Sequence, residues 1–266
     1  ANAVRHFSDL TGVDDSLVTS IEPAPDELEY EGAEYMIAVR SDPTSGASVL
    51  STTIQTSMLL ARTLDAPSVH ASDGLYGTKA FVFTDDLDVT NRLFADLLDA
   101  EGQRYVGRRT RQIKPPLASM RLPIDGDIAA QRRAGQSWDL PVALGHQFQN
   151  TGLTVSRTTS QDAGVDFDSQ VVVATASLEV GFDDPAVGAV VQHKAPRGVA
   201  PFLQRKGRAG RSRSMRPYTA VILSDYGRDR SSYEAWDALF EPVLPQLVLP
   251  IRNHAVLRMQ ASLALI

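Results

Sequence analysis

The sequence predicts an α/β fold in which a mainly parallel sheet carries helices on both faces. Short apolar segments, typical of buried strands, alternate along the chain with longer segments whose apolar residues recur at helical spacing. Repeated strand–helix units of this kind indicate a parallel sheet. The chain has 266 residues, of which 43% are apolar and 22% charged, so its composition is that of an ordinary globular protein rather than a disordered or fibrous one.

The first half of the chain supplies two strand–helix units. Residues 34–40 (EYMIAVR) and 79–85 (KAFVFTD) are short apolar runs that predict strands. Residues 48–65 carry apolar residues at helical spacing, and a second helix is predicted to end at Gly102. The stretch 66–78 contains Ser, Gly and Pro and is expected to be a loop.

The second half of the chain resumes the same alternation. Residues 169–175 (SQVVVAT) and 189–194 (AVVQHK) predict buried strands. A helix is predicted over roughly 199–210, and it is followed by a strand over 218–224. The order along the chain therefore supports the parallel sheet.

An irregular insertion over about 103–150 separates the two halves. Its residues show little period, and an insertion of this size is usually a surface lobe, a functional loop or a mobile segment. Its basic side chains could meet phosphate, or they could form a solvated face; the sequence favours neither. These basic residues are Arg104, Arg108, Arg109, Arg111 and Lys114.

The domain organisation follows from these elements. Residues 1–45 are expected to be a connection from a preceding lobe, 46–240 the main lobe with its insertion, and 241–266 the start of a C-terminal extension. The extension ends in apolar LALI, so we expect the chain to be part of a longer protein.

Composition excludes several functions. There is no cysteine, which removes disulfides, zinc fingers and thiol nucleophiles, and the five histidines form no metal-binding pair, so no metal site is predicted. The net charge of −6 excludes a globally basic nucleic-acid binder but not a local basic patch. No apolar run approaches the roughly 18 residues of a membrane span, so no membrane partner and a cytoplasmic location are expected.

The strongest motif is QRKGRAGR, Gln204–Arg211. From position 194 to 216 the chain carries eight basic residues and no acidic one. If the helix continues through this motif, Gln204, Arg208 and Arg211 share one face, where two guanidiniums could clamp a phosphate. The alternative is a basic helix end that satisfies its own carbonyls and dipole.

A second motif, VVVATASLEVGFDDP, occupies Val171–Pro185. Small and hydroxyl residues where a strand ends suit a contact with backbone phosphate, because ligands of α/β sheets bind at the carboxyl edge. Asp183 could accept a hydrogen bond from a sugar hydroxyl or from an arginine. The alternative is an ordinary strand–turn–helix joint with an aspartate cap.

In this order, KAFVFTDD, VVVATASLEVGFD and QRKGRAGR resemble motifs IV, V and VI of superfamily 2 helicases, which mark the second RecA-like lobe. The resemblance spans Lys79–Arg211, and the strand–helix alternation extends it to about Ser224. The phrases TASLEVGFDDPAVGAVVQHKAPR and MRPYTAVILSDYGRDR, together with the insertion, also resemble helicases of bacterial phage-defence islands such as the DISARM helicase.

The resemblance implies a role for each motif residue. Arg208 and Arg211 would be arginine fingers that reach the γ-phosphate of ATP held by another lobe, and we expect both to face the carboxyl edge of the sheet. Gln204, Gly181 and Asp183 would lie beside the nucleotide.

The resemblance also implies a contact with nucleic acid, single-stranded or duplex, with DNA favoured over RNA. The residues expected to touch its backbone are Thr84, Thr175 and Ala176.

One departure from the family pattern is large. No GxxxxGK[ST] loop occurs in the sequence, so ATP and Mg²⁺ would be held mainly by a first RecA-like lobe outside it, and the isolated chain is expected to be inactive. The alternative is a non-catalytic RecA-like scaffold or nucleic-acid-binding module in a multi-subunit complex, with other defence-system subunits as partners.

Overall fold

The computed structural model describes residues 3–27, 32–42, 44, 46–69, 71–106, 109–122, 128–159, 166, 168–175, 178, 183–241 and 254–264. By its internal contacts the chain divides into two units, one of Tyr30–Pro242 and one of Ala1–Glu29 with Val243–Ile266. The predicted boundaries at residues 45 and 240 stay a prediction, although the strand over residues 35–40 belongs to the larger unit.

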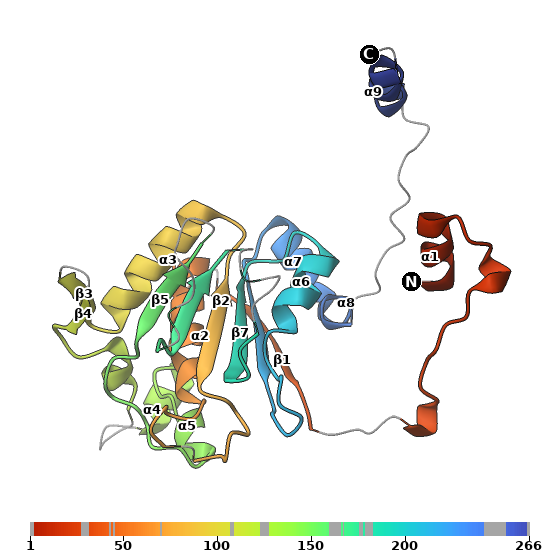
Figure 1. Cartoon of the computed structure of the whole chain (residues 1–266). Helices are drawn as coiled ribbons and strands as arrows, with labels where there is room; N and C mark the ends of the chain where they lie inside the picture. Colours follow the sequence, from red (N-terminus) through yellow and green to blue (C-terminus); the bar gives the residue numbers. More distant parts are fainter. Residues whose placement is uncertain are drawn as a thin grey trace. The chain divides into compact units, whose positions relative to one another are not determined.

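A six-stranded, wholly parallel sheet forms the centre of the larger unit, in the order β1-β8-β7-β2-β6-β5 (Figure 1). This architecture confirms the predicted α/β class, and each predicted strand is present. The strands are β1 (Tyr35–Arg40), β2 (Lys79–Phe83), β5 (Val155–Thr158), β6 (Val171–Ala174), β7 (Val187–His193) and β8 (Tyr218–Leu223).

Helices cover both faces of this sheet. The helices α2 (Val49–Arg62) and α3 (Leu87–Ala100) pack on the face that includes Ala80 and Val82. The opposite face includes Phe81 and Phe83, as expected for side chains that alternate along a strand. On that side lie α6 (Val199–Lys206) and α8 (Trp236–Phe240), whose Phe202 and Phe240 pack together, while α7 (Gly227–Glu234) contacts β8 and β1.

Side chains at the helix ends explain why α2 and α3 begin and where they are tied. Ser48 and Asp86 cap the two helices, each accepting a hydrogen bond from a backbone N–H of the first turn. At the other ends, the fully buried Arg62 forms a two-pronged ion pair with Glu101, with both N–O distances 2.7 Å. Arg62 also donates to the carbonyls of Gln149 and Thr151, so the pair joins both helices to the chain that enters β5.

The insertion is more ordered than predicted. It contains an antiparallel hairpin, a 3₁₀ turn and two short helices, and the buried Trp138 packs into the core of the sheet's first face. The strand β5, just after the insertion, was not predicted because its four residues combine Val with Ser, Arg and Thr. The insertion's elements are β3 (Gln103–Val106), β4 (Arg109–Gln112), η3 (Leu117–Arg121), α4 (Ile128–Arg133) and α5 (Leu140–Ala143).

The smaller unit is helical in its described parts. It comprises α1 (Ala3–Thr11), the 3₁₀ turns η1 (Asp15–Leu17) and η2 (Pro25–Glu27), and α9 (His254–Ala264). Among all described residues of the chain, no helix has the length and apolar character to cross a membrane.

Candidate functional site

The basic motif does not form the continuous helix that sequence spacing suggested. Helix α6 ends at Lys206 with Gly207 as its C-cap, so Arg208 and Arg211 lie in the turn beyond it. Gly210 has a φ of +75°, and a Cβ there would stand 2.7 Å from the Pro217 ring. The expectation that Gln204, Arg208 and Arg211 share one helical face is therefore wrong, because two glycines end the helix between them.

The structure nevertheless brings the second and third motifs together. The guanidinium Nε of Arg211 lies 3.6 Å from Oδ1 of Asp183, and the two side chains are 41% and 72% exposed. A long, exposed ion pair of this kind contributes at most about 1 kcal/mol, so Arg211 can exchange its partner at little cost. Of the two partners considered for Asp183, a sugar hydroxyl or an arginine, an arginine lies at ion-pair distance, while Arg208 is half-buried and Gln204 is exposed.

This pair lies where β7 begins. Asp183 precedes β7 by four positions, and the N–H of Gly210 donates to the carbonyl of Val187, the first residue of that strand. We expected Arg208 and Arg211 to face the carboxyl edge of the sheet, and for Arg211, which follows Gly210 at the start of β7, that expectation is wrong. After α6 the chain runs back along β7 to the amino edge, so the motif ends there.

A buried ion pair holds the turn that carries Asp183. Lys79 Nζ lies 2.5 Å from Oδ2 of Asp184, and the two side chains are 7% and 8% exposed. Oδ1 of Asp184 accepts a hydrogen bond from the N–H of Ala186. Lys79 is the first residue of β2, but nothing in the sequence indicated that it would pair with Asp184 and so hold the turn that carries Asp183.

The residues predicted to contact nucleic acid follow the carboxyl ends of β2 and β6, at the opposite edge. Thr84 is fully buried, and its hydroxyl contacts the Thr90 hydroxyl at 2.5 Å and donates to the Asp86 carbonyl. Its contact with nucleic acid stays a prediction that this buried side chain does not support. Thr175 is half-buried beside the end of β6. Gly181 and Ala176 lie outside the described residues.

Another arginine of the basic motif, Arg205, has a structural environment that the sequence did not reveal. Its Nη1 lies 2.6 Å from Oδ1 of Asp85 and donates to Oε1 of Gln192, and its side chain is 4% exposed. The guanidinium also lies over the Phe83 ring, 5.5 Å from the ring centre. Charge density alone could not distinguish this buried arginine from the exposed Arg211.

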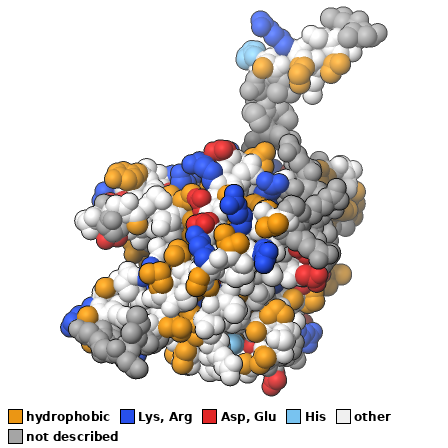
Figure 2. Space-filling view, turned by 90° about the vertical axis from the view of Figure 1, so that its left-hand side faces the viewer, with side chains coloured by type: hydrophobic (Ala, Val, Ile, Leu, Met, Phe, Trp, Pro, Cys, Tyr) orange, Lys and Arg blue, Asp and Glu red, His pale blue; other side chains and the backbone are white. Residues whose placement is uncertain are grey.

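The face at the β5 end of the sheet carries lysine and arginine side chains among acidic and hydrophobic ones (Figure 2). Of the insertion's basic residues, Arg104 and Arg111 are exposed, and Lys114 pairs with Asp99 at 2.8 Å. Arg108 lies outside the described residues, and the side chain of Arg109 is not described. The two interpretations of these residues, phosphate contact and solvated face, both remain open.

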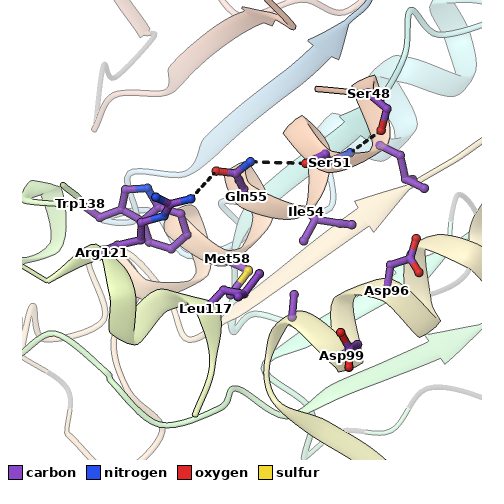
Figure 3. A pocket seen from close by; sticks show the side chains of 12 residues that line it. Ser48, Ser51, Ile54, Gln55, Met58, Asp96, Asp99, Leu117, Arg121 and Trp138 are labelled. Atoms are coloured by element: carbon purple, nitrogen blue, oxygen red, sulfur yellow. Dashed lines mark hydrogen bonds between the residues drawn. The ribbon is translucent and has the colours of Figure 1, made fainter. Parts of the chain in front are cut away.

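A pocket between α2, α3 and the insertion lies apart from the motifs (Figure 3). It has a volume of about 330 Å³, and one wall is a chain of hydrogen bonds from Arg121 to Gln55, Ser51 and Ser48. The opposite wall carries Asp96 and Asp99. Its lining includes none of the predicted site residues, so it adds nothing to the motif site.

A buried histidine, His193, lies at the end of β7, at the carboxyl edge of the sheet. Nδ1 of His193 lies 2.7 Å from the hydroxyl of Thr53, and burial lowers the pKa of His193 to about 4. A neutral, hydrogen-bonded histidine of this kind supports packing rather than catalysis. Among the described residues, no group of three or more His, Asp or Glu side chains could hold a metal ion.

Comparison with known proteins agrees with the motifs. Residues 154–213 match the family model of the helicase conserved C-terminal domain. The matched range contains β6, β7 and α6 together with Asp183, Arg208 and Arg211. This segment therefore matches the helicase C-terminal domain, which confirms the resemblance to the second lobe of superfamily 2 helicases.

Individual relatives match this chain over part of their length. The Lhr helicase/uracil glycosylase of Escherichia coli (strain K12) is 33% identical over 129 residues, which are 48% of this chain and 8% of that protein. The structure of Mycobacterium smegmatis helicase Lhr bound to ssDNA and AMP-PNP has 16% identity and a TM-score of 0.49, covering 87% of this chain and 25% of its own.

A second solved structure shows a similar level of likeness. That of S. cerevisiae Dbp5 bound to RNA and ADP BeF3 has 13% identity and a TM-score of 0.46, covering 99% of this chain and 53% of its own. The chain thus spans only a small part of the curated relative and a quarter to a half of these two proteins.

Proposed function

We propose that this chain is the second motor lobe of an ATP-dependent helicase or translocase that acts on nucleic acid, with DNA favoured over RNA. In this proposal Arg208 and Arg211 are arginine fingers, and ATP and Mg²⁺ are held by a first RecA-like lobe outside the sequence. The observation that carries the proposal is the exposed Arg211, which the fold presents beside Asp183 inside the matched helicase domain.

The surroundings of Arg211 fit a residue that must reach a ligand. Gly210 and Pro217 fix the turn before it, and the buried Lys79–Asp184 pair fixes the turn that carries its partner. Among the described residues, the guanidinium pairs with Asp183 through a long, exposed contact. A rigid base with a loosely paired head group lets the planar guanidinium leave a carboxylate and bind phosphate oxygens with little reorganisation.

The residues present suit only part of a nucleotide site. The described part of the chain offers guanidiniums but no acidic cluster for a metal ion, and the sequence has no phosphate-binding loop. When bound, ATP supplies the phosphoryl group that is transferred to water. The chemical contribution of this chain is to stabilise the negative charge that develops on that group.

Binding to nucleic acid would be directed at phosphates, and therefore independent of sequence and strongly dependent on salt. The predicted contact region is the carboxyl edge around Thr175, on the opposite edge from Arg211. A motor lobe of this design would hold nucleic acid at one edge of the sheet and act on nucleotide from the other.

The test uses the full-length protein that contains this lobe. Arg208→Ala and Arg211→Ala should each lower ATP turnover by about 10³-fold, as the loss of an arginine finger does, while the Kd for AMP-PNP changes far less. Arg213→Ala is the matched control, since Arg213 is an exposed arginine two positions further on. Near wild-type turnover in both variants would refute the arginine-finger assignment and favour the non-catalytic module.

A further inference from the structure

The buried Arg205 joins two parts of the domain that the proposed function treats as separate. Its partners, Asp85 and Gln192, both lie at the carboxyl side of the sheet, after β2 and near the end of β7. Asp85 stands between Thr84 and Asp86, in the loop that leads into α3. The Arg205 side chain is therefore in direct contact with the loop at the predicted nucleic-acid edge.

The other side of this connection runs through the backbone. Arg205 precedes Arg208 by three positions, and the N–H of Arg208 donates to the Arg205 carbonyl at 3.0 Å. The next two residues are also fixed, since Ala209 donates to Lys206 and Gly210 to Val187. Ala209 is itself buried on the Phe81 face of the sheet. A shift of the Arg205 side chain would thus move the turn that carries Arg208 and Arg211.

The chemistry of the link favours a directional role over simple packing. A buried ion pair can often be replaced by apolar side chains without loss of stability, so stability alone does not require it. The planar guanidinium instead fixes the orientation of the Arg205 side chain relative to its neighbours. One of its nitrogens contacts both Asp85 and Gln192, while its flat face lies over the Phe83 ring. A displacement of Asp85 would therefore shift the Arg205 guanidinium in a fixed direction, and with it the end of α6.

We propose that Arg205 is a positioning residue that couples the nucleic-acid edge to the arginine fingers, through Asp85 on one side and the turn 207–210 on the other. This inference rests on the proposed function. It assigns to a residue without access to ligand the task of making nucleotide binding and nucleic-acid binding depend on each other. Such dependence is reciprocal and is measured as a ratio of affinities.

The experiment measures this ratio in the full-length protein. The probe is a fluorescein-labelled single-stranded DNA, whose Kd is determined with and without AMP-PNP. The wild-type ratio is expected to lie in the range of about 5 to 150 that allosteric coupling usually gives. A wild-type ratio of one would contradict the proposed function itself, and the inference about Arg205 would fall with it.

The variants separate coupling from folding. Arg205→Met with Asp85→Leu replaces the pair by apolar groups and should bring the ratio to within about twofold of one, with each separate affinity retained. Arg205→Lys keeps the positive charge but lacks the planar guanidinium, so it should lower the ratio in part. If the double variant does not fold, Arg205→Lys is the variant that tests the proposal. Arg230→Met, in an exposed pair with Glu234, is the control and should leave the ratio unchanged.

Two results would overturn the proposal. One is a wild-type ratio in the folded double variant, or in Arg205→Lys if only that variant folds. The other is an equal weakening of DNA and AMP-PNP binding that leaves the ratio unchanged, which would show a structural role alone.

Discussion

Arg205 and Arg211 stand six positions apart in one basic motif, and the fold uses them in opposite ways. Arg205 has a side chain that is 4% exposed, with a carboxylate, an amide and an aromatic ring around its guanidinium. Arg211 is 41% exposed and, within the described part of the chain, forms a long ion pair with Asp183. The helix ends between them, at Gly207, and this break sends one side chain into the domain and the other to the surface.

The difference shows what a charged motif does and does not specify. A run of arginines predicts that phosphate or carboxylate partners exist, but the position of the helix end decides which arginine meets an internal partner. In this domain the buried Arg205 holds neighbouring elements in position, and the exposed Arg211 is accessible to a ligand. Variants of the two arginines, of the turn between them and of a neighbouring buried histidine therefore test the comparison directly.

The largest expected difference is in stability. Arg205→Ala would leave the largely buried Asp85 carboxylate and the buried amide oxygen of Gln192 without the Arg205 guanidinium, and should lower the free energy of unfolding by about 3 kcal/mol. Arg211→Ala removes only an exposed pair and should cost less than about 1 kcal/mol. Urea unfolding of the two variants measures this contrast, and equal losses would show that the environments differ less than their exposures indicate.

The turn between the arginines should be nearly as sensitive. Gly210→Ala places a Cβ 2.7 Å from Pro217 at a φ of +75°, which should cost about 3 kcal/mol through strain and overlap. The same unfolding experiment measures it. Gly198→Ala is the matched control, because a Cβ there meets only atoms at 3.5 Å or more, and should cost far less. An unchanged midpoint in Gly210→Ala would mean that the turn can rearrange freely.

A smaller effect should come from His193, a second buried polar group at the same edge as Arg205. Its pKa is lowered by burial to about 4, below the usual 6.5, so the folded state resists protonation. Its contribution to stability is complete above pH 6.5 and is lost as the pH falls toward 4, which amounts to about 2 kcal/mol between pH 7 and 5. His193→Gln should flatten this part of the pH profile, and an equally steep profile would assign the effect to other groups.

Sequence reasoning predicted the parts of the fold that depend on local pattern. The strands β2, β6 and β7 follow from the short apolar runs typical of buried parallel strands. The edge strand β5 escaped prediction because only its pairing with β6 reveals it.

The site was predicted less completely, since it depends on contacts between distant residues. The motif pattern gave an arginine as one of two possible partners of Asp183, and the carboxyl edge expected for Arg211 was the wrong edge of the sheet. Neither the Lys79–Asp184 pair nor the Arg205–Asp85 pair has a local signal, because the partners are 105 and 120 positions apart. Only the folded chain shows which charges neutralise one another.

The most direct test of the account is ATP turnover by full-length Arg211→Lys, compared with Arg213→Lys. Both changes keep a positive charge and both positions are exposed, so folding and net charge are matched. We expect a large loss of turnover in Arg211→Lys alone, because an ammonium cannot reproduce the two-pronged contact of a guanidinium with phosphate. Equal turnover in the two variants would contradict the role of Arg211 at the nucleotide.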